Sequence, residues 1–78
     1  MKITTFCVWL LYKDSTAVYV PAYKEIVGQK INDAILSFAV MYHLQVYDVD
    51  LISGEDRKWI VWYLSTQGDF VQYEFREM

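Results

Sequence analysis

The sequence predicts an α+β fold in which one amphipathic helix packs on a mostly antiparallel sheet, with the element order ββαβββ. Two short runs, residues 6–12 and 59–64, are apolar at every position, as in strands that meet apolar surroundings on both faces. Between them, residues 31–44 carry apolar side chains at helical spacing. With 78 residues and no linker, the chain is expected to form one small domain over residues 1–78.

The first two strands are expected to form a β-hairpin. The apolar run at residues 6–12 is followed by a polar turn at residues 13–16 and by a second short run at residues 17–20. Pro21 has no main-chain N–H to donate to a ladder, so the second strand is predicted to lie at a sheet edge or to end there.

The helix is predicted from Ile31 to Leu44. Asn32 or Asp33 is expected to cap its start, where an acidic side chain also suits the positive end of the helix dipole. Its apolar stripe, at the spacing of one helix face, consists of Ile31, Ala34, Ile35, Phe38, Ala39 and Tyr42.

Three strands are predicted after the helix. Residues 46–52 alternate, and the side chains divide into Tyr47, Val49 and Leu51 on one face and Asp48 and Asp50 on the other. A polar turn at residues 53–58 leads to the apolar run 59–64. After a turn at residues 67–69, residues 71–76 alternate as in a strand with one solvated face.

The helix carries a second apolar line. Leu36, Val40 and Leu44 project almost opposite the core stripe, where a helix resting on a sheet is normally charged. Burying three such side chains would contribute on the order of 5–8 kcal/mol. Although scattered exposed apolar residues are common, three in register predict a protein contact at this face.

The sheet also carries more apolar side chains than the helix can cover. The apolar run 59–64 can place either Trp59, Val61 and Tyr63 or Ile60, Trp62 and Leu64 toward the helix, and the other triplet must face away. The first strand poses the same choice between Phe6, Val8 and Leu10 and Cys7, Trp9 and Leu11. A homodimer packing sheet on sheet, or a tightly held partner, is expected to cover the remaining face.

Charge, hydropathy and cysteine content limit the kinds of partner and the cellular compartment that are expected. The net charge is -3 with dispersed basic residues, which disfavours nucleic acid, and no run is long enough to span a bilayer. The single cysteine, Cys7, lies in an apolar run and is expected to be a small buried hydrophobe in a reducing compartment, the cytosol.

No catalytic signature is present. His43 with Asp48 and Asp50 is the one grouping that could bind a divalent ion or act as an acid and base. The simpler interpretation is a histidine that suits a helix C-terminus, and aspartates on the solvated side of a strand. Because no spacing matches a metal motif and no glycine-rich phosphate loop occurs, neither a metal, a cofactor nor an enzymatic activity is expected.

Two segments resemble a known family. Val20-Pro21-Ala22-Tyr23, followed by residues 33–39 (Asp-Ala-Ile-Leu-Ser-Phe-Ala), resembles the small bacterial RNA polymerase inhibitors of T7-like phages, which feed a V-P-x-Y strand into a D-x-A-x-x-x-A helix. The similarity covers about a quarter of the chain, which lacks the arginine cluster expected of those inhibitors. The resemblance implies a functional class, proteins that phages and other mobile elements use to block host machinery, anti-CRISPR proteins included.

The expected function is that of a non-enzymatic interaction module that occludes a site on a host protein or complex, as a homodimer in the host cytosol. Alternatives are a self-assembling homo-oligomer subunit and a single-stranded nucleic-acid binder that stacks bases on the sheet aromatics. Acidic residues could complement a basic groove, and Trp and Tyr could supply anchors. The predicted interface consists of Leu36, Val40, Leu44, Asp48, Asp50, Glu55, Asp56, Trp59 and Tyr63.

Overall fold

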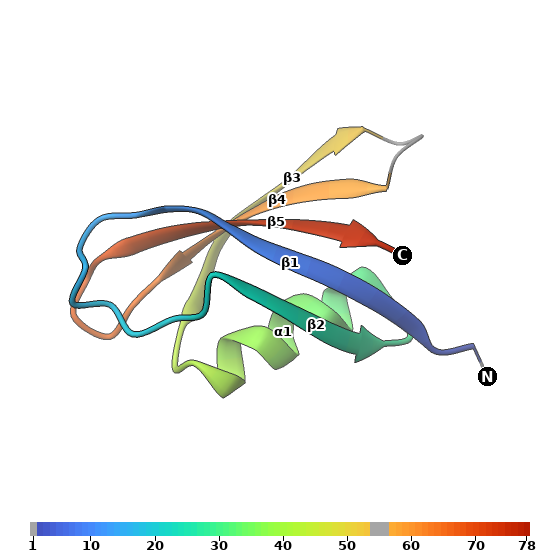
Figure 1. The fold of residues 1–78 in the computed structure, drawn as a ribbon, viewed down its shortest axis with the longest axis horizontal. Coiled ribbons are helices and arrows are strands. Elements are labelled where there is room, and N and C mark those ends of the chain that lie inside the picture. The colour runs from blue at the N-terminus through green and yellow to red at the C-terminus, as the bar shows by residue number, and fades with distance from the viewer. Residues whose placement is uncertain (1, 54–56) are drawn as a thin grey trace.

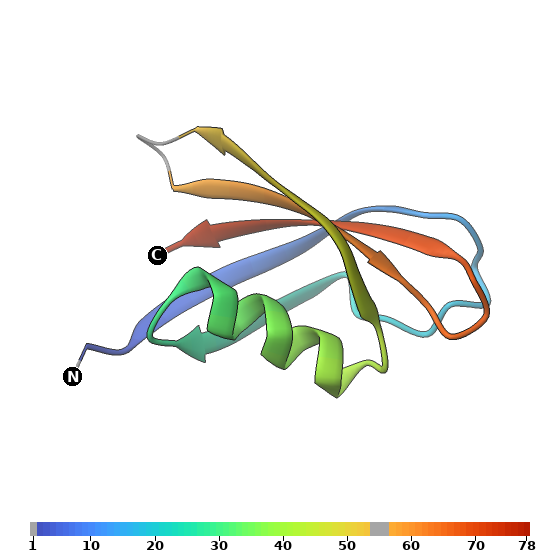
Figure 2. The ribbon, with the colours of Figure 1, turned by 180° about the vertical axis from the view of Figure 1, so that it is seen from behind.

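The computed structural model describes residues 2–53 and 57–78 and confirms the α+β class and the order ββαβββ. One helix lies across one face of a five-stranded antiparallel sheet with strand order β2-β1-β5-β4-β3 (Figures 1 and 2). The elements are β1 (Thr4–Lys13), β2 (Tyr23–Gly28), α1 (Ile31–Met41), β3 (Gln45–Ser53), β4 (Lys58–Leu64) and β5 (Phe70–Glu77).

The predicted partner of the first strand is wrong. β1 pairs with β2, with Trp9 opposite Tyr23, and residues 17–20 form no strand. Val18 is buried in the core, which holds this segment as a loop, and the Pro21 carbonyl accepts a hydrogen bond from the Tyr73 hydroxyl at 2.6 Å. The edge position predicted for the strand over residues 17–20 is therefore wrong for that segment, and the strand at this edge is β2, which follows Pro21.

The helix is shorter than predicted. It begins at Ile31, and the N-cap residue is Lys30 rather than Asn32 or Asp33. Asp33 stabilises the start from within the first turn, where its carboxylate accepts the Lys30 N–H at 3.1 Å. The helix ends at Met41 because His43 adopts the left-handed conformation, with φ of 56°, and the Leu44 N–H returns to the Ala39 carbonyl at 2.8 Å. This is the geometry of a Schellman-type helix end, a place that glycine usually occupies.

The core lies between the helix and one sheet face. Phe38 is fully buried, and its ring centroid lies 4.6 Å from that of Tyr73 and 5.5 Å from that of Tyr63. The Tyr63 hydroxyl donates to the Ile35 carbonyl at 2.8 Å, which ties β4 to the helix. The sequence left open which apolar triplet of each strand faces the helix. In the structure these are Trp59, Val61 and Tyr63 of β4 and Phe6, Val8 and Leu10 of β1.

Two strands carry bulges. In β1 the register shifts between Leu10 and Tyr12, and in β3 it shifts between Val46 and Asp48. The extra residue in β3 is Tyr47. Such an insertion bends a strand and changes the face to which a side chain points.

Candidate protein-interaction surfaces

The outer face of α1 remains apolar. Leu36, Val40 and Met41 are 59%, 76% and 51% exposed, and no described residue covers them. Leu44 does not extend this line, because the helix has already ended and Leu44 packs against the core. The predicted interface is therefore corrected to Leu36 and Val40, with Met41 beside them.

The outer face of the sheet, opposite the helix, is not continuously apolar. Cys7 and Trp9 of β1 and Ile60, Trp62 and Leu64 of β4 point there, as the alternation requires. β5 lies between these strands and contributes Gln72, Glu74 and Arg76. Glu74 lies 3.7 Å from the Lys58 amine and 3.6 Å from the Arg76 guanidinium, so a row of paired charges separates the apolar side chains of β1 and β4 near the C-terminal end of β5. At the other end of β5 the apolar side chains meet, because the rings of Tyr12 and Trp62 lie 6.0 Å apart across the strand.

The two predicted aromatic anchors lie on the wrong face. Tyr63 is fully buried, and burial raises the pKa of its hydroxyl. Trp59 is half-buried against the core, with its ring 6.2 Å from that of Phe6 in an edge-to-face arrangement. Neither side chain is placed to anchor a partner on the outer face, where Ile60 and Trp62 lie instead.

A hollow of about 290 Å³ opens on the outer face of the sheet beside β3. We call it the aromatic hollow, and it is lined by Tyr47, Asp48, Trp62 and Phe70. The Phe70 ring lies 4.9 Å from Tyr47 and 6.2 Å from Trp62, both edge-to-face, and Tyr12 lies 6.0 Å from Trp62. Four rings thus form a continuous row at this end of the sheet.

Asp14 holds two parts of this row together. Its carboxylate accepts the Tyr12 hydroxyl through one oxygen and the Phe70 N–H at 2.8 Å through the other. The pKa of Asp14 is lowered, first by the hydrogen bond from Tyr12 and second by the hydrogen bond from Phe70. The hydrogen bond between Tyr12 and Asp14 also raises the pKa of the Tyr12 hydroxyl. Asp14 therefore fixes the loop end of β1 against the start of β5.

The bulge in β3 places Tyr47 and Asp48 together in the lining of the aromatic hollow. Strict alternation would place Tyr47 and Asp48 on opposite faces, as predicted from the sequence. With Tyr47 inserted as an extra residue, Asp48 pairs opposite Trp62 while the Tyr47 ring contacts Phe70, so both lie on the outer face. Val49 and Leu51 keep the predicted opposite face.

Asp48 and Asp50 both lie exposed on the outer face of β3, opposite Trp62 and Ile60. Neither carboxylate makes a hydrogen bond or ion pair within the part of the chain that the structure describes. Their charges are therefore available to a partner. Glu55 and Asp56, the other predicted acidic contacts, lie outside the described residues.

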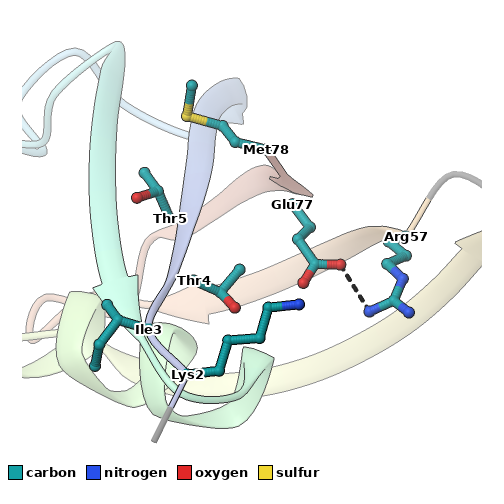
Figure 3. A pocket seen from close by; sticks show the side chains of 7 residues that line it. All are labelled: Lys2, Ile3, Thr4, Thr5, Arg57, Glu77 and Met78. Carbon is teal, nitrogen blue, oxygen red and sulfur yellow. Dashed lines mark hydrogen bonds and ion pairs between the residues drawn. The ribbon is translucent and has the colours of Figure 1, made fainter.

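A second hollow, of about 490 Å³, lies where the two chain ends meet (Figure 3). Its two cationic side chains are Lys2 and Arg57. The Arg57 guanidinium pairs with Glu77 at 2.8 Å, and Lys2 extends toward the same carboxylate. The single carboxylate of Glu77 balances one of these two positive charges, so the hollow offers an anion no more than one net positive charge from its side chains.

The remaining chemistry-bearing side chains stay apart. No group of three or more metal-ligating residues occurs within residues 2–53 and 57–78. Cys7 is buried, and its sulfur lies 3.3 Å from the oxygen of the Tyr23 hydroxyl, which donates its one hydrogen to Glu25 at 3.0 Å. His43 is exposed at the end of the helix.

Comparison with protein-family models, with curated proteins and with solved structures finds no significant match. Within the described residues, no helix has both the length and the apolar character needed to cross a bilayer.

Proposed function

We propose that this chain is a non-enzymatic protein-binding module that acts by covering a site on a larger protein. The resemblance of residues 20–23 and 33–39 to phage inhibitors of host RNA polymerase supports a role of that kind in a host cytosol. On this proposal the chain belongs to the class of proteins that block host machinery or a defence complex.

The outer line of α1 carries the proposal. Leu36 and Val40 are more than half exposed on adjacent turns, with Met41 beside them. Covering the exposed parts of Leu36 and Val40 would contribute about 2–4 kcal/mol to an association. A helix face of this kind suits a groove on a partner, where side chains at i and i+4 serve as anchors.

A homo-oligomer is the second candidate. The same helix line can pack on its own copy about a two-fold axis, because a self-complementary apolar stripe satisfies that symmetry. The outer sheet face supports this less well, since the charged row of Lys58, Glu74 and Arg76 would be buried between two copies.

The sheet aromatics support nucleic-acid binding least. Lys58 and Arg76 are already paired with Glu74, and the unpaired carboxylates of Asp48 and Asp50 lie beside the aromatic hollow. Phosphates would be repelled there, whereas base-stacking surfaces combine rings with unpaired positive charge.

The test is affinity capture from a bacterial lysate with the chain carrying Leu36→Asp and Val40→Asp together. We expect the double variant to lose the partner captured by the parent while its circular dichroism spectrum is unchanged. Val27→Asp is the matched control, because Val27 is 57% exposed on β2 and away from the helix line. Unchanged capture by the double variant would contradict the proposal.

Sedimentation equilibrium separates the two candidates. A parent chain that is dimeric alone, and that the double variant converts to a monomer with no other protein captured, would favour the homo-oligomer. A monomeric parent that captures a larger protein would favour the blocker.

A further inference from the structure

β3 is a long strand at an edge of the sheet (Figure 1). It runs over Gln45–Ser53, and only one of its two hydrogen-bonding edges pairs with a strand of the chain, β4. Apart from that ladder, no described main-chain hydrogen bond involves residues 45–51. Such an edge presents unpaired N–H and C=O groups on which another extended chain can form a ladder.

The two faces of this edge differ in chemistry. Asp48 and Asp50 lie on the outer face, while Val49 and Leu51 lie on the helix side, 38% and 60% exposed. The helix lies beside the start of β3, and the far end of this strand extends away from it (Figure 2). A strand added here would meet carboxylates with one set of side chains and aliphatic groups with the other.

The aromatic hollow adds a specific feature on the acidic face. It joins the rings of Tyr47, Trp62 and Phe70 to the unpaired carboxylate of Asp48. The faces of aromatic rings attract cations, and a neighbouring carboxylate supplies the opposite charge. The apolar stem of a lysine or arginine can lie against the rings while its charged end meets the acid.

We infer that β3 binds an extended segment of a partner protein in which lysine or arginine alternates with apolar residues. The segment adds a strand to the sheet, with its apolar side chains on Val49 and Leu51 and its basic side chains along Asp48 and Asp50. One of those basic side chains occupies the aromatic hollow.

Charge disfavours a second copy of this chain as the occupant of the β3 edge. If two β3 strands paired about a two-fold axis, Asp48 and Asp50 of both copies would form one row of carboxylates on the outer face. Pairing of β3 with β2 of another copy would add Glu25 to the same face. Like charges directly opposite one another destabilise a sheet, so a basic strand is the complementary partner.

This inference rests on the proposed function, because it specifies how a partner protein is held. The test uses the whole chain and three end-blocked synthetic peptides of about eight residues, the usual length of a strand. In the first peptide lysine alternates with valine. The second has glutamate in place of lysine, and the third has the composition of the first with its lysines clustered.

Binding is followed by calorimetry and by the NMR signal of the Trp62 indole N–H. We expect the alternating lysine peptide to bind, more weakly at high salt, and the other two to bind at least about tenfold less tightly. Asp48→Asn and Trp62→Leu are each expected to weaken binding about threefold to tenfold. Glu25→Gln, a carboxylate on the same face at the opposite edge, is the matched control and is expected to leave the affinity unchanged.

Several results would overturn the inference. They are equal binding of the glutamate or clustered peptide, unchanged binding by Asp48→Asn and Trp62→Leu, and a dimer that forms through β3. Absence of peptide binding would also refute it, and the proposed function would survive if capture still depended on Leu36 and Val40. Conversely, specific peptide binding together with capture that ignores Leu36 and Val40 would support the edge site and refute the helix site.

Discussion

Tyr63→Phe tests how the sheet holds the helix. The substitution removes one hydroxyl from a fully buried side chain and leaves its ring beside Phe38. The lost hydrogen bond, 2.8 Å long, ends on the carbonyl of Ile35 in the middle of α1. Since a carbonyl in a helix also accepts a main-chain bond, the oxygen keeps one partner, and the expected loss is about 1–2 kcal/mol.

For a domain of this size that loss corresponds to a fall in Tm of roughly 5–15 °C. Urea denaturation followed by circular dichroism should show a lower midpoint with an unchanged slope. Tyr19→Phe removes the same hydroxyl from a side chain that is 98% exposed and is expected to have no effect. If Tyr63→Phe proves as stable as the parent, the contact between β4 and the helix does not contribute as argued.

Three further predictions concern stability. Hydrogen bonds lower the pKa of Asp14, so its carboxylate should stabilise the fold fully above the ordinary pKa near 4, and this stabilisation should be lost as the pH falls through the lowered pKa. In an acid titration of stability, Asp14→Asn should lack the loss that the parent shows in this pH range. Gly68→Ala should cost about 1 kcal/mol in urea denaturation, because φ is +87° although nothing lies within 4 Å of the added carbon; equal stability would refute this. His43→Gly should raise the thermal midpoint, because glycine adopts the left-handed conformation that ends α1 without strain, and a lower midpoint would show that the imidazole stabilises the fold.

The class and order of the elements could be predicted because they depend on local periodicity. Alternation at β3 and β5 and the helical repeat from Ile31 recur within a few residues, so these three elements can be recognised without their neighbours. The partner of β1 could not be identified this way. Residues 17–20 resemble a strand, yet burial of Val18 makes them a loop, and β2 follows Pro21 instead.

The candidate site was predicted only in part. Leu36 and Val40 follow from helix geometry, and the acidic face of β3 follows from alternation. Tyr63 and Trp59 were assigned to the surface because a run that is apolar on both faces does not indicate which side meets the helix. The aromatic hollow was missed, because it joins β3 to β4 and β5 through a bulge that no local pattern announces.

The sequence by itself determined one helix and four of the five strands, and it indicated more apolar area than one helix covers. The tertiary structure decided which triplet is buried, that the charged row of Lys58, Glu74 and Arg76 interrupts the outer face of the sheet, and that Tyr47 joins Asp48 on that face of β3. These outcomes depend on register, since a shift of one residue between strands exchanges the faces of every side chain that follows.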